Sequence, residues 1–409
     1  MQAAASLSRR ALLQLALTTL LPATATATAG QQLPDDGTQS GNLFISGARR
    51  GPDEHVAVVF DEQARRIASI PLSARAHGAA SHRASHQACL FARRPGLYLH
   101  AFDRRDPERH LTVAPVAGRH FYGHGSYSAD GRLLFATEND FDAQRGVLGI
   151  YDTAAGYQRL GEMDTGGTGP HEVVRIPGSA LLIVANGGIH THPDTGREKL
   201  NIDSMAPSLT VVDSRNGDLL ARHVLPAEWH QVSLRHLAVD VEGNVWFAGQ
   251  YEGAEAVIGG LAGVMSVDRS LRSFQRGRSS QGLSLVELPA DLQQRTSHYL
   301  SSVAVAGDHV LFTSSKGGLM FSVDRVSAQL LETLSVRDCS GVSVIPADTD
   351  AVAASNEQRS STLANDLMDM PSATALLTSG TGEIMALSED GAMSLAIHRV
   401  QWDNHVYAI

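Results

Sequence analysis

A histidine recurs along the chain at a nearly constant spacing, and this repeat limits the possible folds more than any other feature. The four positions are His77, His124, His171 and His236, separated by 47, 47 and 65 residues. The longest interval exceeds the others by 18 residues and contains a polar stretch of similar size, from Ile189 to Pro207. Repeats of this length are typical of folds assembled from similar structural units.

Each repeat unit contains four short runs rich in β-branched and aromatic residues. After His124, a first strand and an Asp-Gly turn are followed by the runs Arg132–Thr137, Gly146–Asp152 and Tyr157–Met163. In a later unit, residues 271–275 (LRSFQ) are predicted to form the fourth strand. Four strands in about 40–47 residues, separated by Asp-Gly, Asn-Gly and Glu-Gly turns, are typical of a β-propeller blade.

The number of such units predicts seven blades. Six continuous units begin near His77, His124, His171, Ser233, His298 and Cys339. The seventh is composite, because residues 43–72 supply only three strands and residues 402–409 remain as an unpaired inner strand. We therefore expect an all-β, seven-bladed β-propeller closed by pairing the C-terminal strand with the N-terminal blade, which removes open sheet edges. An unclosed array of β-sandwiches explains neither the period nor the terminal strands.

The N-terminal segment has the features of an export signal. A twin arginine at positions 9–10 precedes an apolar run, and small residues at 25–29 offer cleavage sites. We expect residues 1–29 to be a twin-arginine (Tat) signal peptide, residues 30–42 a linker and residues 43–409 a single propeller domain. An ordinary secretory signal is the alternative, and either one predicts a periplasmic protein.

Charge and hydropathy exclude two classes of partner. The formal net charge of −10 repels phosphate backbones, so we expect no nucleic-acid partner. The apolar run from Ala11 to Pro22 is too short to span a bilayer, so no transmembrane segment is expected in the mature protein. The chain has two cysteines, Cys89 and Cys339, and their redox state stays open in an oxidising compartment.

Propeller topology predicts where the polar residues meet. The innermost strand of a blade begins, and the second strand ends, at the same face of the ring, which we call the mouth. The residues that open inner strands are His77, His124, His171, His236, Cys339 and His405. Those that close second strands are Arg49, Arg93, Glu138, Asn139, Asn186, Gln250, Lys316 and Asn356.

Several imidazoles around one axis predict a transition-metal site. Imidazole suits iron, copper, zinc and nickel, and Glu138 or Glu172 could complete the ligand shell. A thiolate at Cys339 would favour copper or iron, although a lone buried cysteine is more often a small apolar residue. Iron or copper is the expected metal, with Glu138, Asn139, Asn186 and Gln250 as further cofactor-binding candidates. In the alternative interpretation, each histidine bonds to backbone carbonyls between blades.

Two segments do not fit the repeat. The insertion at 188–207 joins a second strand to a third and therefore lies at the mouth, as a lid or as a plain surface flap. There His190, His192 and Asp194 could add metal ligands, whereas Arg197 and Lys199 could hold a carboxylate. The segment 357–372 is expected to be a second insertion.

Long motifs of the chain resemble a known family. They are GHGSYSADGRLLFATENDF, GVLGIYD, GGTGPHEV, ANGGIHTHPDTGREKLNIDSMAPSL, SLRHLAVD, GQYEG and WDNH, and the likeness extends from about residue 43 to 409. The chain resembles the domain of unknown function 1513 family, whose members are Tat-exported periplasmic propeller proteins often encoded beside imelysin-type and di-haem proteins. The resemblance thus implies iron uptake as context and imelysin-like or haem proteins as partners. The 357–372 insertion lengthens a link that is short in the family, so no role is carried over to Asn356.

Three functions follow from these features. The leading hypothesis is a periplasmic metal-handling propeller, serving iron acquisition, with a histidine-lined central mouth. The second is a lactonase-like metal-dependent hydrolase that uses Glu138, Asn139, Asn186 and Asn356, although hard Ca²⁺ prefers oxygen ligands to histidine. The third is a non-enzymatic interaction scaffold for an iron-uptake system. The sequence leaves open whether the protein is an enzyme, and its fold alone cannot decide.

Overall fold

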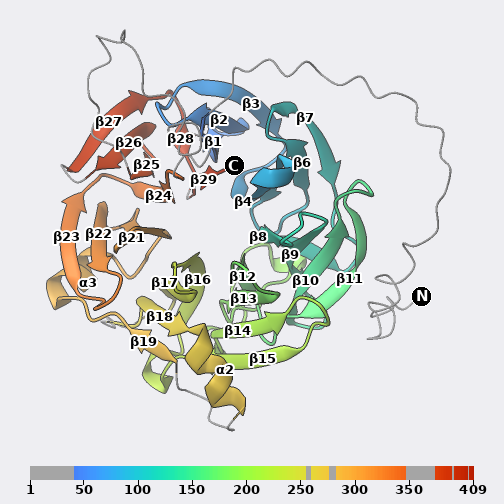
Figure 1. Ribbon diagram of the computed structural model, residues 1–409, viewed down its shortest axis with the longest axis vertical. Coiled ribbons are helices and arrows are strands. Elements are labelled where there is room, and N and C mark those ends of the chain that lie inside the picture. Colours follow the sequence, from blue (N-terminus) through green and yellow to red (C-terminus); the bar gives the residue numbers. More distant parts are fainter. Residues whose placement is uncertain (1–40, 255–258, 276–281, 347–373, 389–390, 404) are drawn as a thin grey trace, which may run out of the picture.

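Seven antiparallel sheets surround a central axis in the computed structural model of the chain (Figure 1). The structure describes residues 41–254, 259–275, 282–346, 374–388, 391–403 and 405–409. Within them the predicted seven-bladed β-propeller is confirmed. The predicted signal peptide, almost all of the linker, the 357–372 insertion and Asn356 lie outside the described residues. In the described part of the chain, no helix has the length and apolar character needed to cross a bilayer.

The N-terminal blade is composite, as the leftover strands predict. It contains β1 (Leu43–Arg49), β2 (His55–Asp61), β3 (Arg66–Leu72), β28 (Gln401–Trp402) and β29 (Tyr407–Ala408). Both C-terminal strands pair with β1, through Ala48–Trp402 and Ile45–Tyr407 among other pairs. The expected single inner strand is thus two short strands, interrupted where the chain between them turns His405 toward the axis.

The next three blades follow one another along the chain. The second blade consists of β4 (Ala76–His82), β5 (Gln87–Ala92), β6 (Leu99–Asp103) and β7 (Asp106–Val113). The third consists of β8 (Arg119–Tyr127), β9 (Leu133–Asp140), β10 (Arg145–Asp152) and β11 (Gln158–Asp164). The fourth consists of β12 (Pro170–Arg175), β13 (Leu181–Asn186), β14 (Ser208–Asp213) and β15 (Leu219–Val224). The short helices η2 (Pro193–Thr195) and η3 (Ile202–Ser204) lie in the insertion between β13 and β14, and η1 (Arg83–Ser85) and η4 (Ala227–Trp229) lie in other connections.

Three further blades complete the ring. The fifth consists of β16 (Val232–Val239), β17 (Asn244–Tyr251), β18 (Ala262–Ser266) and β19 (Leu283–Leu285). The sixth consists of β20 (Ser302–Ala306), β21 (His309–Ser314), β22 (Leu319–Asp324) and β23 (Leu330–Ser335). The seventh consists of β24 (Cys339–Val344), β25 (Ala375–Ser379), β26 (Glu383–Ser388) and β27 (Gly391–Ile397). Helix α3 (Ala290–Arg295) joins the fifth blade to the sixth.

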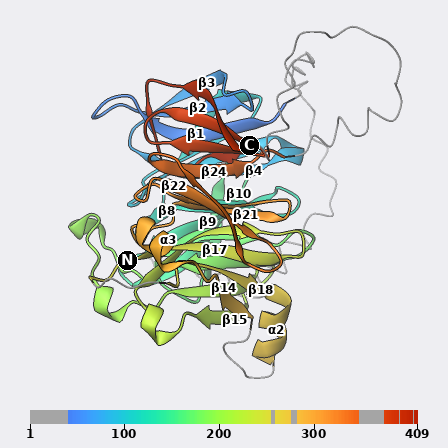
Figure 2. The same cartoon turned by 90° about the vertical axis from the view of Figure 1, so that its left-hand side faces the viewer.

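The fifth blade departs from the predicted strand pattern. Residues 271–275, predicted as its fourth strand, belong instead to helix α2 (Val267–Gln275), and the outer strand is β19. The Ser270 side chain donates a hydrogen bond to the carbonyl of Ser266, and Arg272 pairs with Asp268 one turn away. These helical contacts, and packing of α2 beside β15 and β18, outweigh the strand pattern of a five-residue segment (Figure 2).

The core lies between neighbouring blades rather than in one central mass. Large side chains that are fully buried include Phe91, Phe121, Phe135, Trp246 and Phe312. They pack in clusters that each join the faces of adjacent sheets. The axis itself is therefore left to the residues of the inner strands, and those residues are polar.

Candidate metal centre

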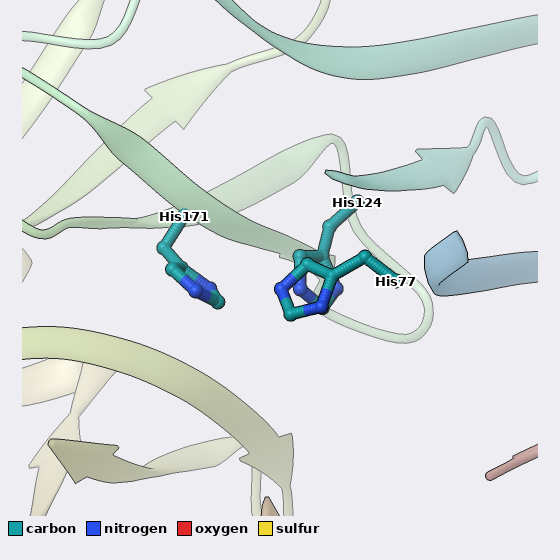
Figure 3. Close-up of side chains that lie close together, drawn as sticks. All are labelled: His77, His124 and His171. Atoms are coloured by element: carbon teal, nitrogen blue, oxygen red, sulfur yellow. The ribbon is translucent and has the colours of Figure 1, made fainter. Parts of the chain in front are cut away.

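Five histidines meet at the axis of the propeller. They are His77, His124, His171, His236 and His405, and each is buried. Their ring centroids are 4.3 Å apart for His236 and His405, 4.7 Å for His77 and His124, and 4.7 Å for His171 and His236. Figure 3 shows three of these rings, from three consecutive blades, gathered at one point. Histidines at equivalent places in successive repeat units thus meet at the axis.

Irregular strand pairing lets the inner strands present these histidines. The register of β4 with β5 shifts between Ala76 and Ala79, and that of β8 with β9 shifts between Phe121 and Gly125. A shift also occurs at His171 in β12, between Pro170 and Glu172, and another directly before His236 in β16. A β-bulge re-aims a side chain that a regular ladder would hold on a fixed face.

Two glycines make room for the neighbouring imidazoles. A Cβ on Gly78 would lie 2.5 Å from His124 Nδ1, and a Cβ on Gly123 would lie 2.5 Å from His77 Cδ2. Gly123 also has a φ of +118°, a conformation that other residues rarely adopt. In the AHG and GHG motifs, the histidine therefore supplies the imidazole, and the adjacent glycine leaves room for the imidazole of the neighbouring blade.

Glu172 fixes the orientation of two of the rings. His236 Nδ1 donates to Glu172 Oε2 over 3.2 Å, and His124 Nδ1 lies 3.5 Å from Glu172 Oε1. Burial by itself would raise the pKa of Glu172, but His124 and His236 outweigh that effect and lower the pKa to about 2. This buried side chain is therefore a carboxylate, which can only accept hydrogen bonds. The proton of the His236 imidazole consequently lies on Nδ1, and its Nε2 keeps the lone pair. Metal-binding histidines are commonly oriented by a carboxylate in this way.

Four of the imidazoles, those of His77, His171, His236 and His405, are neutral at neutral pH. Burial, followed by repulsion from neighbouring rings, lowers the pKa of His77, His171 and His405 well below the usual value. Burial lowers the pKa of His236 to about 4, against the opposing effect of Glu172. Neutral imidazole is the form that coordinates a metal ion.

Some buried ring nitrogens in the cluster have no hydrogen-bond partner in the part of the chain that the structure describes. These atoms are His124 Nε2, His171 Nδ1, His236 Nε2 and His405 Nε2. Two groups, His77–His124–His171 and His124–His236–His405, each place their possible ligand atoms within 4.8 Å of one another. Ligands that each lie about 2 Å from one ion are separated by roughly 3–4 Å, so the observed spacing is close to that of a ligand set. The donor types and their spacing therefore fit a transition metal ion.

A cavity adjoins the cluster on the side of the sixth and seventh blades. Its volume is about 200 Å³, and Glu172, His236 and Tyr407 belong to its lining. Residues of β20 and β24, among them Ser302 and Ser343, line it as well. A cavity of this size and polarity has room for water or a small ligand beside the histidines.

Cys339 opens β24 as predicted, but its side chain lies apart from the histidines. The thiol is fully buried among apolar residues of the sixth and seventh blades, including Leu311, Met320 and Leu377. Burial and the nearby Asp338 raise its pKa to about 12, so the thiol keeps its proton. Cys339 and Cys89 are both free thiols.

The four further cofactor-binding candidates have structural partners. Glu138 accepts hydrogen bonds from Tyr151 and Arg159, and Asn139 donates to the carbonyl of Thr191. The amide of Asn186 donates to the carbonyl of Thr165 and to two hydroxyls of its blade. The backbone of Gln250 bridges that of Tyr299. The structure brings none of these four into the two histidine groups.

Residues of the 188–207 insertion lie near the mouth in a separate group. His192 Nε2 lies 3.6 Å from Asp142, and His190 and His192 line a cavity of about 130 Å³ with Asn139.

Tyr407, whose hydroxyl lies 3.0 Å from His124 Nδ1, was not a sequence candidate. Its place two residues after His405, on the terminal inner strand, was the signal that could have identified it.

The fold and the axial cluster define a class: a seven-bladed propeller with a buried imidazole centre. The profile of the family described as Protein of unknown function (DUF1513) matches residues 70–374, and the chain belongs to this family. No curated protein matches the sequence. Among solved structures, the hydrazine synthase of Kuenenia stuttgartiensis is similar with a TM-score of 0.55 at 10% identity, covering 91% of this chain and 100% of that chain. A nidogen/laminin complex has a TM-score of 0.44 at 13% identity, covering 72% and 92%. The first likeness supports the fold alone.

Proposed function

We propose that this protein binds a transition metal ion between the axial histidines and handles that ion as cargo. The observation that carries the proposal is the closeness of four buried ring nitrogens that have no partner among the described residues, on histidines whose possible ligand atoms lie within 4.8 Å of one another in two groups. Leaving one buried polar atom without a hydrogen bond costs about 1–3 kcal/mol, and at the axis one ion could satisfy several such atoms at once because they lie close together. Coordination would supply the missing partners.

The chemistry of the donor atoms limits which metal ions the site could bind. Neutral imidazoles with a carboxylate in hydrogen-bond contact suit iron, copper, zinc and nickel, and they do not suit Ca²⁺ or Mg²⁺, which prefer oxygen. We propose iron or copper, handled in the periplasm for iron acquisition together with imelysin-like or haem proteins, as the family resemblance implies. Glu172 would hold the ligand tautomers, and the adjoining cavity would leave one side of the ion accessible.

The test is metal binding by the full mature protein. Calorimetric titration with Cu²⁺, and with Fe²⁺ under anaerobic conditions, should show one tight site, which the double variant His124→Ala/His171→Ala loses while keeping its melting temperature. His223→Ala is the matched control, because His223 is equally buried and its nitrogens lack partners, but it lies on the outer strand β15. Failure of the unaltered protein to bind either ion would refute the proposal.

A further inference from the structure

Arginines from several parts of the chain gather at the mouth, next to the histidine cluster. They are Arg75, directly before β4; Arg93 and Arg94, directly after β5; Arg197, in the insertion; and Arg235, directly before His236. The backbone of Arg93 donates to the carbonyl of Arg75 over 2.8 Å, which places these two at one end of a strand pair. Arg75 precedes an inner strand, Arg93 and Arg94 follow a second strand, and Arg235 lies at the register shift of inner strand β16.

The arginines outnumber their acidic partners. Arg75 pairs with Asp403, and Arg235 pairs with Glu252, which is shared with Lys199. Among the described residues, Arg93 and Arg197 have no carboxylate within ion-pair distance. The Nε atom of Arg235 is buried and has no acceptor. Cationic groups with unused donors therefore remain at the mouth.

The positive charges act on one another and on the cluster below. Burial lowers the pKa of Arg93 to about 9, and repulsion from Arg75 and Arg197 adds to the effect. Burial also lowers the pKa of Arg197, as do its other arginine neighbours. Arg235 directly precedes His236 in β16, and its charge contributes to the lowered pKa of His171. Like charges crowded in this way are destabilising unless an anion joins them.

Resting on the metal site proposed above, we propose that the mouth binds a polycarboxylate anion directly over the histidine cluster and that the metal is taken up as its carboxylate complex. A bare dication approaching this face would meet the repulsion of the unpaired guanidinium groups. An anionic complex would be attracted instead. The planar fork of arginine matches a carboxylate with two parallel hydrogen bonds, and a carboxylate can bind a metal ion at the same time.

The experiment uses citrate as the probe and the full mature protein without added metal. Calorimetry should show citrate binding that weakens at least tenfold in Arg93→Gln/Arg197→Gln, with an unchanged melting temperature. Arg66→Gln is the control, because Arg66 is exposed at the opposite face of the ring, at the start of β3. Sulfate, titrated in parallel, should bind at least tenfold more weakly than citrate.

The outcomes separate the two proposals. Absence of citrate binding, or binding that the double arginine variant leaves unchanged, overturns the anion site even if metal ions bind. Equal affinity for sulfate and citrate overturns the assignment to carboxylates. Metal titration in a buffer without carboxylates tests the histidine cluster separately, and Arg93→Gln/Arg197→Gln should keep that binding. If metal uptake is no faster from citrate than from the free ion, delivery as a complex is refuted.

Discussion

Five blades place a histidine at the axis, whereas the sixth and seventh place none there. In β4, β8, β12 and β16 the strand register shifts at or beside the histidine. Strand β20 of the sixth blade pairs with β21 without a shift, and in β24 a serine, Ser340, lies at the shift. The inner strands of five blades therefore place imidazoles at the axis, whereas those of the sixth and seventh blades do not. As a result the histidine cluster lies toward the five blades, and a cavity lined in part by β20 and β24 lies beside it.

Deleting residues 402–409 should have the largest effect, because the composite blade supplies both ring closure and a histidine. Trp402, Val406 and Ile409 are each at most 3% exposed. Their burial contributes roughly 5–8 kcal/mol, comparable with the stability of a whole domain. We expect an insoluble or molten product, measured by solubility and by near-ultraviolet circular dichroism.

His405→Ala is the control for that deletion. It removes the imidazole and keeps the pairing of β28 and β29 with β1, so we expect native melting with weakened metal binding. A deletion protein that melts like the unaltered chain would contradict closure by the C-terminal strands.

Gly123→Ala should damage the histidine cluster more than a glycine substitution away from it. The added Cβ would displace His77 and strain a positive φ, and we expect metal affinity to fall at least tenfold with a loss of about 1–3 kcal/mol of stability. Gly178→Ala is the control, since Gly178 has a φ of +69° but open space around its Cβ position. Calorimetry and thermal melting measure the two effects, and equal losses of metal affinity in both variants would contradict the role of Gly123.

Glu172→Gln should weaken metal binding by about 10–100-fold, the usual effect of removing a group that orients a ligand. The amide keeps the shape of the side chain, but it no longer accepts protons from both His124 and His236 as an anion does. Calorimetric titration of both proteins measures the change. The control Glu62→Gln changes a half-buried carboxylate directly after β2, away from the cluster, and should bind metal as the unaltered protein does. Undiminished binding by Glu172→Gln would contradict the orienting role.

The pH dependence of stability should also distinguish the two sets of blades. Because burial lowers the pKa of His236 to about 4, the unfolded chain takes up a proton near pH 6.5 that the folded metal-free protein takes up only near pH 4. The free energy of unfolding should therefore decrease as the pH falls from about 6.5 to 4.

Melting temperatures across that range test this prediction. His236→Ala should flatten the decrease, whereas His309→Ala, at an exposed position in the sixth blade, should not. Because burial lowers the pKa of His236, its metal affinity should also decline only at pH values below those at which an exposed imidazole is protonated. A His236→Ala profile parallel to that of the unaltered protein would contradict the lowered pKa.

The sequence was most informative where the structure repeats. A spacing of 47 residues, turn dipeptides and unmatched terminal strands were enough to predict seven blades and the closure, because each blade has nearly the same local pattern. The same repeat identified His77, His124, His171 and His236 as a set. It failed for residues 271–275, where a five-residue run cannot separate strand from helix and packing against β15 and β18 decides.

The sequence by itself determined the architecture and which histidines face the axis, since strand period and turn chemistry are local properties. Only the tertiary structure decided how those residues interact. Glu172 joins His124 and His236 from other blades, the thiol of Cys339 lies among apolar side chains, and Glu138 is held by Arg159. Side-chain direction depends on bulges, and partner choice depends on contacts between residues from different blades. These are set by packing around the ring, which no single repeat unit contains.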